Sequence, residues 1–315
     1  MISYAHVNHD LRVRLGEAKF NDMKAAKDYS KGECVDNSTS NTIQDSNAKP
    51  TYENIHREME FVEKPYLVYP MNISVSNILY FTVVPTLCYQ LNYPRVARIR
   101  YKHVLSYIGR ILGVFGMIIF IIEQYIKPTL ANTVIPMRDM DGLAIFQRIL
   151  SLSIPNTYVW LLGFYLYFHL WLNLLAELTR FGDRMFYRDW WNSKNIETYW
   201  RLWNLPVHNW MLRHLYNPIL RWGFSKRVAV YSVFFFSAAF HEVVISTPFR
   251  YFALHAFFGM LAQAPLISVT QWLDKRFDNP IMGNVLFWCV FCVFGQPMGV
   301  VMYYCDLYKR NNQNP

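Results

Sequence analysis

The sequence has few charged residues and few cysteines. Asp, Glu, Lys and Arg make up 17% of its 315 residues, whereas hydrophobic residues make up 53%. Soluble globular domains carry about 25% charged residues, so this composition favours a membrane protein. Cys289 and Cys292 form a C-x-x-C pair, but they lie in a run of Phe, Val and Trp that offers no polar setting for zinc or redox chemistry. We therefore expect ordinary packing at both cysteines and no metal site.

Long stretches without charge predict membrane spans. A helix needs about 20 predominantly apolar residues to cross a bilayer. Five segments meet this requirement, at 103–126, 149–176, 228–249, 251–273 and 279–305. The sequence therefore predicts an all-α multi-pass membrane protein whose embedded domain covers residues 103–307.

The segments outside this domain differ in charge and in proline content. Residues 1–64 hold nine Lys and Arg against eleven Asp and Glu, a net charge of −2, and we expect a largely flexible cytosolic segment there. Residues 65–93 carry no formal charge but several prolines, which favours a shallow helix in an interfacial region at 65–102 over a span. Residues 308–315 are a short tail.

The distribution of basic residues orients the spans. Beyond residue 64 the chain carries 22 basic and 11 acidic residues, a net charge of +11. Such a balance suits nucleic acid or a membrane surface, and the apolar spans favour the membrane and no nucleic-acid partner. The loop at 180–227 holds nine basic and three acidic residues. Because cytoplasmic loops collect Lys and Arg, we expect this loop and residues 1–102 in the cytosol and the C-terminus in the lumen.

His241 is the sharpest candidate for chemistry. It lies inside a predicted span, in F-F-F-S-A-A-F-H-E, and an ionisable residue within a bilayer is a functional candidate. A neutral imidazole there can act as a general base for a lipid hydroxyl. From the span alone, a structural histidine bonded to a neighbouring helix is equally good. Glu242 follows it, but adjacent helical residues point about 100° apart, so Glu242 need not touch the ring. For His169 and His255, which have no adjacent carboxylate, a structural role is favoured.

The loop after the second span combines arginines with aromatic residues. Residues 181–192 read F-G-D-R-M-F-Y-R-D-W-W-N. Arginine pairs with phosphates, and Trp or Tyr stacks on adenine, so the loop suits a nucleotide such as CoA. The alternative is an aromatic and basic belt at the lipid headgroups. Asn204, further along, has an amide that can hold an oxyanion.

Residues 186–192 match the F-Y-x-D-W-W-N signature of a known family. The sequence resembles the membrane-bound O-acyltransferases, in their diacylglycerol and sterol acyltransferase branch, over about residues 71–307, with a further S-Y-A-H-V-N match at 3–8. The resemblance implies a helical bundle with about five transmembrane helices plus interfacial helices. It also implies that about three earlier membrane helices, which precede the S-Y-x-x-V-N motif in the family, lie outside this sequence.

The resemblance also implies roles for particular residues. The catalytic set comprises His241 as the base, Asn204, Glu242 and Gln296. Acyl-CoA is bound by Phe186, Tyr187, Arg188, Asp189, Trp190, Trp191, Asn192 and His208. Met260 and Gln263 line the path of the acceptor. No cofactor is expected, since acyl-CoA is a substrate.

The sequence around Asn204 bears on the acceptor. Residues 204–210 read N-L-P-V-H-N-W and resemble the N-I-P-V-H-K-W of diacylglycerol enzymes, whereas sterol enzymes lack the proline. The resemblance thus implies an endoplasmic reticulum enzyme, a possible homo-oligomer, that makes triacylglycerol from diacylglycerol by direct transfer. Two alternatives stay open: an acyltransferase for sterols or fatty alcohols, and a non-catalytic partner of a complete enzyme.

Overall fold

Helices form the regular structure of the part of the chain that the computed structural model describes, residues 69–277 and 280–313. These residues belong to one compact unit, Arg57–Pro315. The polar segment expected at 1–64 and the short match at 3–8 lie outside the described residues. The shallow helix expected after them corresponds to α3 (Val75–Val83), which Ser74 caps by accepting a hydrogen bond from the Asn77 N–H at 3.2 Å.

Within the described residues, five helical stretches are long and apolar enough to cross a membrane, which confirms the predicted number. They are Tyr101–Arg138, Gly142–Leu178, Lys226–Pro248, His255–Leu273 and Gly283–Arg310. The described chain is all-α, as predicted, apart from one isolated antiparallel bridge between Arg95 and Phe181.

Most spans are built from several helical segments that follow one another directly. The first contains α4 (Tyr101–Ile121), η1 (Ile122–Ile126), α5 (Lys127–Ala131) and α6 (Val134–Arg138), and the second contains α7 (Gly142–Phe164), η2 (Tyr165–Trp171) and α8 (Leu172–Leu178). The long loop contains η3 (Trp190–Asn192), α9 (Ile196–Leu202), α10 (Leu205–Met211), η4 (Leu212–Tyr216) and α11 (Asn217–Arg221). The last three spans lie in α12 (Lys226–Phe249), in α13 (His255–Leu261) with α14 (Gln263–Phe277), and in α15 (Pro280–Cys289) with η5 (Val290–Gly295) and α16 (Gln296–Gln313).

Several span boundaries differ from the prediction. The region 127–148, expected as a loop, is mostly helical. The second span begins at Gly142, where the Asp141 carboxylate caps α7 by accepting a hydrogen bond from the Ala144 N–H at 3.1 Å. The fourth span begins at His255 rather than at 251. Arg250 ends α12 in the left-handed conformation, with φ of 51°, and residues 251–254 form an irregular connection.

Prolines explain most of the π-helical turns in the described chain. η1, η4 and η5 each end two residues before a proline, namely Pro128, Pro218 and Pro297. Proline has no N–H for the carbonyl four residues earlier, so the hydrogen-bond ladder there widens to five residues. η2 has no such proline and contains His169 instead. Because π turns inside helices often mark functional sites, the position of His169 in η2 makes it a candidate for a functional role.

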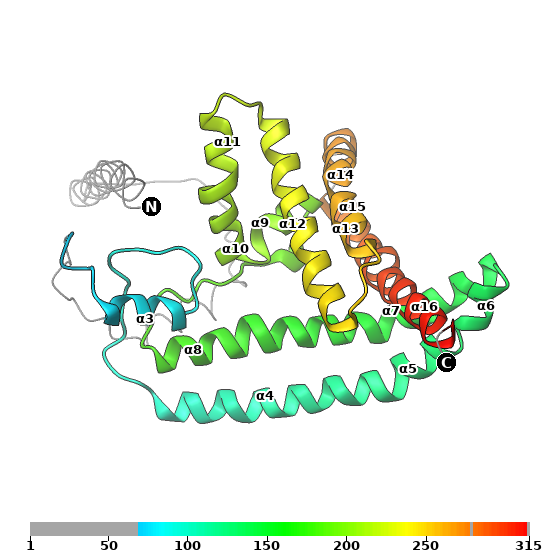
Figure 1. The fold of residues 1–315 in the computed structure, drawn as a ribbon, viewed down its shortest axis with the longest axis horizontal. Coiled ribbons are helices and arrows are strands. Elements are labelled where there is room, and N and C mark those ends of the chain that lie inside the picture. The colour runs from blue at the N-terminus through cyan, green and yellow to red at the C-terminus, as the bar shows by residue number, and fades with distance from the viewer. Residues whose placement is uncertain (1–68, 278–279, 314–315) are drawn as a thin grey trace, which may run out of the picture. The chain divides into compact units, whose positions relative to one another are not determined.

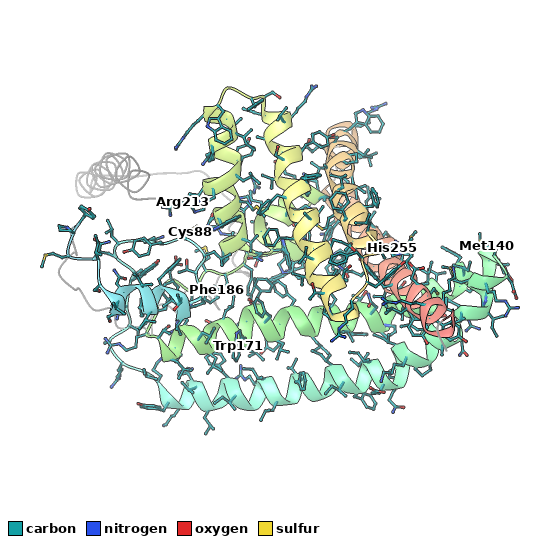
Figure 2. All side chains as sticks on the ribbon, viewed as in Figure 1. Cys88, Met140, Trp171, Phe186, Arg213 and His255 are labelled. Carbon is teal, nitrogen blue, oxygen red and sulfur yellow. The ribbon has the colours of Figure 1, made fainter. Side chains whose placement is uncertain are left out.

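The first two spans lie side by side. α4 packs along α7, η2 and α8 (Figure 1), while α12 packs against α13, and α16 packs against α13 and α7. The turn at Met140 lies at the opposite end of the first two spans from Cys88 and Phe186 (Figure 2). The loops that contain Cys88 and Phe186 therefore share one end of the bundle.

A buried ion cluster stabilises this end of the bundle. Glu177, 1% exposed in the last turn of α8, accepts hydrogen bonds from Arg100 Nε and Nη2, both at 3.0 Å. Its Oε2 also pairs with Nη1 of Arg184 at 2.7 Å. Arg100 precedes α4 and Arg184 lies in the long loop, so one carboxylate holds the start of the first span and the loop to the end of the second.

The first prediction concerns this cluster. Replacing Glu177 by Leu leaves Arg184 buried without its carboxylate, and breaking a buried ion pair in this way costs about 3 kcal/mol of folding free energy. Unfolding of the purified chain in detergent measures the loss. Glu123→Gln is the matched control, because Glu123 pairs with Lys127 at an exposed i,i+4 position and should change stability by no more than about 0.5 kcal/mol. Equal shifts in the two variants would contradict the assignment.

Candidate active site

The signature loop, residues 181–194 with the signature at 186–192, lies alongside the segment that contains Asn204. The Arg188 N–H donates to the Leu202 carbonyl at 2.9 Å, and the Leu205 N–H donates to the Phe186 carbonyl at 2.9 Å. Two of the motifs that the sequence analysis selected separately, 186–192 and 204–210, are therefore joined by their backbones.

The side chains of the signature divide into a buried and an exposed group. Phe186 and Trp190 are each 2% exposed. Trp190 packs against Trp160 and Phe164, with ring centroids 5.3 and 5.0 Å away. The exposed members are Arg188, Asp189, Trp191 and Asn192. Of the residues expected to bind acyl-CoA, Phe186 and Trp190 are thus buried and support the loop, and the side chains of the four members just named are exposed.

Tyr187 connects the signature to the second span. Its hydroxyl lies 2.9 Å from Nδ1 of His169, and the Tyr165 ring stacks on the His169 ring at 5.0 Å. Burial, with smaller contributions from Tyr165 and Asp189, raises the pKa of Tyr187 to about 12, so the hydroxyl keeps its proton at neutral pH. His169 therefore has a structural partner, as the sequence favoured, but the partner belongs to the signature.

Asn204 is the N-cap of α10. Its Oδ1 accepts a hydrogen bond from the Val207 N–H at 3.1 Å, and no hydrogen bond joins its Nδ2 to another described residue. The cap therefore fixes the amide so that its two N–H donors stay available. One turn later lies the half-buried His208, where burial, followed by the charge of Arg201, holds the pKa of the imidazole below its usual value. The imidazole of His208 is therefore neutral at pH 7.

His241 is half-buried on α12, and its ring orientation is fixed from its own helix. Nδ1 lies 2.7 Å from the backbone carbonyl of Ser237 and 3.4 Å from the Ser237 hydroxyl. A carbonyl only accepts, so Nδ1 carries the proton and Nε2 presents a lone pair. Sequence reasoning missed Ser237, although a serine four residues before a helical histidine lies on the same face and could have indicated it.

The register between two helices places His241 relative to Asn204. The helix made of α10, η4 and α11 turns back at residues 222–225 and runs beside α12 (Figure 1). Trp210 and Phe236 stack across this pair with ring centroids 5.9 Å apart. His241 lies five residues beyond Phe236, and Asn204 six residues before Trp210. Since every helical residue rises about 1.5 Å, His241 is level with the start of α10.

Glu242 does not bond to His241. Its carboxylate is 3% exposed and accepts hydrogen bonds from the Ser246 hydroxyl at 2.5 Å, the Leu254 N–H at 2.9 Å and the Tyr303 hydroxyl at 2.9 Å. These bonds join the end of α12 to the start of α13 and to α16. The described partners of Glu242 are thus structural, and Tyr303 is a partner that the sequence did not indicate.

The other selected residues lie on the last two spans. Gln296 is the first residue of α16, directly after the π turn η5. Met260 is half-buried on α13, the helix that packs against α12. Gln263 begins α14 and donates from Nε2 to the Gly259 carbonyl at 3.3 Å. The fold thus places Met260 on the neighbour of the His241 helix, while Gln296 donates from its backbone N–H to the Phe291 carbonyl and its side chain makes no hydrogen bond to another described residue.

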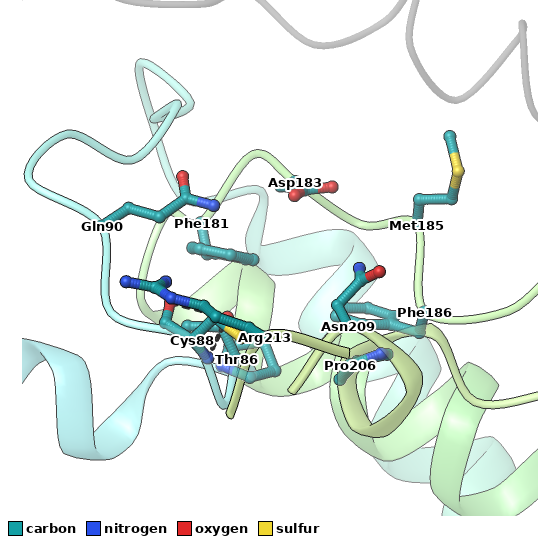
Figure 3. A pocket seen from close by; sticks show the side chains of 11 residues that line it. Thr86, Cys88, Gln90, Phe181, Asp183, Met185, Phe186, Pro206, Asn209 and Arg213 are labelled. Carbon is teal, nitrogen blue, oxygen red and sulfur yellow. Dashed lines mark hydrogen bonds between the residues drawn. The ribbon is translucent and has the colours of Figure 1, made fainter. Parts of the chain in front are cut away.

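A pocket of about 260 Å³ lies beside the start of the signature (Figure 3). Its lining comprises Pro85, Thr86, Cys88, Gln90, Phe181, Asp183, Met185, Phe186, Pro206, Asn209 and Arg213. Arg213 donates to the Tyr89 carbonyl at 3.1 Å. Pro206, Asn209 and Arg213 are spaced by three and four residues and share one helix face.

With this geometry in place, comparison with known proteins decides the family. The model of the MBOAT family, the membrane-bound O-acyltransferases, matches residues 55–304. The chain belongs to the membrane-bound O-acyltransferase family. The resemblance drawn from the signature is confirmed, and so is the multi-pass membrane architecture.

Similar proteins indicate the branch. Diacylglycerol O-acyltransferase 1 of Corylus americana is 44% identical over 313 residues, which cover 99% of this chain and 51% of that protein. Diacylglycerol O-acyltransferase 1A of Glycine max is 42% identical over 313 residues, covering 99% and 55%. Diacylglycerol O-acyltransferase 1 of Arabidopsis thaliana is 50% identical over 238 residues, covering 76% and 45%. The chain spans about half the length of the curated relatives it matches.

The second prediction separates the two tryptophans of the signature. Trp190→Ala empties a packed site among aromatic rings and should cost about 3–5 kcal/mol of folding free energy. Trp191→Ala should cost less than about 1 kcal/mol, because the Trp191 side chain is 45% exposed. Unfolding in detergent, together with the amount of each variant in membranes, measures both. Equal losses would show that the two side chains are not divided into support and contact surface.

Proposed function

We propose that this chain carries the acyl-transfer centre of an acyl-CoA:diacylglycerol acyltransferase that makes triacylglycerol in the endoplasmic reticulum membrane. The observation that carries the proposal is one arrangement of three features. A histidine with a free ring nitrogen is level with an asparagine whose amide N–H groups are available, and the acyl-CoA signature is bonded to the residue after that asparagine. The names of the similar proteins support the choice of substrates.

The reaction is direct transfer without an acyl-enzyme. Nε2 of His241 takes the proton from the free hydroxyl of diacylglycerol while that oxygen attacks the thioester carbonyl of acyl-CoA. General-base assistance of this kind contributes about 10²–10⁴-fold in rate. The bond from Nδ1 to the Ser237 carbonyl holds the ring in the required tautomer and stabilises the imidazolium that forms.

The oxyanion of the tetrahedral intermediate needs a hydrogen-bond donor, and the sulfur of the departing CoA needs a proton. Asn204 Nδ2 donates to the developing oxyanion, since its Oδ1 is committed to the helix cap. Collapse of the intermediate breaks the carbon–sulfur bond, and His241 returns its proton to the CoA sulfur. The products are triacylglycerol and CoA, and the histidine is neutral again. No cofactor takes part, because acyl-CoA supplies the activated acyl group.

The charge pattern of the chain supports the side from which CoA enters. The exposed signature residues lie in the basic loop 180–227, which we place in the cytosol, where acyl-CoA is soluble. The acceptor and both acyl chains stay within the bilayer, near Met260 on the helix beside α12. Pro206 in the first turn of α10 distinguishes the segment from the sterol type, which supports diacylglycerol as the acceptor.

Product analysis tests the proposal. The full chain is expressed in membranes of cells that lack triacylglycerol synthesis, and labelled oleoyl-CoA is supplied with diacylglycerol, cholesterol and hexadecanol together. We expect labelled triacylglycerol as the main product. Steryl or wax ester as the main product would replace the acceptor by a sterol or fatty alcohol. No product at normal protein levels would overturn the proposal in favour of a non-catalytic partner.

The third prediction isolates the amide of Asn204. Asn204→Asp keeps the capping oxygen, so α10 should stay intact, but it loses the N–H donors and should lower the transfer rate about 10²–10³-fold. Asn195→Asp is the matched control, because Asn195 caps α9 in the same way through the Thr198 N–H at 2.9 Å. Its transfer rate should stay within about twofold of the parent. A parental rate for Asn204→Asp would remove Asn204 from the mechanism.

A further inference from the structure

We propose that Gly283, Asn284 and Trp288 of α15 are positioning residues that hold the backbone of the signature loop, so that its exposed side chains are preset for acyl-CoA. The inference rests on the proposed function for the identity of the ligand. The holding contacts themselves stand on the geometry of α15 and of residues 191–194.

Two side chains of α15 donate to carbonyls of the loop. Asn284 Nδ2 donates to the carbonyls of Trp191 and Ser193, both at 3.0 Å. Trp288 Nε1 donates to the Trp191 carbonyl at 3.1 Å. Asn284 and Trp288 are four residues apart and thus share one face of the helix. The Trp191 carbonyl receives two donors, one from each.

Gly283 brings the helix close enough for these bonds. A Cβ at position 283 would overlap the Lys194 carbonyl, so α15 meets the loop backbone directly at this residue. Gly283 is the helical glycine at which the described structure places backbone from another segment in this way; at Gly109, Gly113 and Gly259 a Cβ would meet nothing within 4 Å. The requirement for glycine at 283 is therefore one of space.

The loop has little structure of its own with which to resist motion. η3 is a single 3-10 turn, closed by bonds from the Asn192 N–H to the Asp189 carbonyl at 3.2 Å and from the Ser193 N–H to the Trp190 carbonyl at 3.1 Å. The donors of α15 occupy carbonyls and leave the side chains of Trp191 and Asn192 exposed. A loop that is already ordered loses less conformational entropy when it binds a ligand.

Two variants remove the donors while keeping a side chain of related shape. Trp288→Phe keeps an aromatic ring next to Trp190, whose ring centroid is 5.9 Å away, and loses the Nε1–H together with one ring of the indole. Asn284→Leu has a similar shape and loses both donors of the amide. Trp272→Phe is the matched control, since Trp272 is 62% exposed on the neighbouring α14.

The experiment uses the purified full chain in lipid nanodiscs and two measurements. Hydrogen exchange of the backbone amides at 190–194 is followed without ligand, and binding of a non-hydrolysable thioether analogue of oleoyl-CoA is titrated. We expect faster exchange at 190–194 in both variants. The Kd for the analogue should rise about threefold in Trp288→Phe and about tenfold in Asn284→Leu, with Trp272→Phe unchanged.

Each other outcome overturns part of the inference. Unchanged exchange in both variants would show that α15 does not hold the loop. Faster exchange with an unchanged Kd would show that the held loop does not serve acyl-CoA. If the parent chain binds no analogue, the proposed function fails, and with it the role of α15 toward acyl-CoA. The exchange data then still decide whether the contact with the loop is structural.

Discussion

The irregular loop between the second and third spans takes backbone hydrogen bonds from other segments of the chain, and the candidate site depends on these bonds. Apart from the bridge at Phe181, the regular structure of residues 181–194 is the single turn η3. The Gly182 N–H donates to the Pro94 carbonyl, the Arg188 N–H to the Leu202 carbonyl, and the Trp191 carbonyl accepts from α15. Because buried backbone groups are costly when they lack a hydrogen-bond partner, these three partners fix the path of the loop. They also bring the signature next to Asn204.

Hydrogen bonds to the backbone also fix the side-chain orientation of the two residues proposed for chemistry. The Ser237 carbonyl decides which nitrogen of His241 is basic, and the cap on α10 decides which end of the Asn204 amide is free. In both residues one half of the side chain bonds to the backbone of its own or the adjoining helix. The other half is left for the substrate. A rigid attachment of this kind is what a preorganised site requires, since the donors need not reorganise during the reaction.

Much of the architecture could be predicted from the sequence, because apolar length sets span number and the signature is specific. The five spans, the family and the short helix α3 are of this kind. The boundaries of the spans could not be predicted from hydropathy, because hydropathy does not detect the helix cap at Asp141 or the left-handed backbone conformation of Arg250. The roles within the signature could not be read either. Whether Trp190 or Trp191 is buried depends on where α7 and α15 pack, and those contacts are long-range.

Partners across the chain were also beyond sequence reasoning. His169 was selected as structural without its partner Tyr187, and Glu242 was selected without Tyr303 on α16, sixty-one residues later. The prolines at 128, 218 and 297, in contrast, were visible in the sequence and could have indicated the π turns that precede them. The helices could therefore be predicted from local sequence patterns. The contacts of the candidate site could not, because they depend on tertiary packing.

We propose that His241 acts on the acceptor and does not serve to bind acyl-CoA. One comparison tests it most directly: the parent chain and His241→Ala, each measured for transfer of labelled oleoyl from oleoyl-CoA to diacylglycerol and for binding of the thioether analogue. We expect transfer by the variant to fall by about 10²–10⁴-fold while its affinity for the analogue stays within about threefold of the parent. Equal transfer by the two chains, or a loss of transfer fully explained by lost affinity, would contradict it.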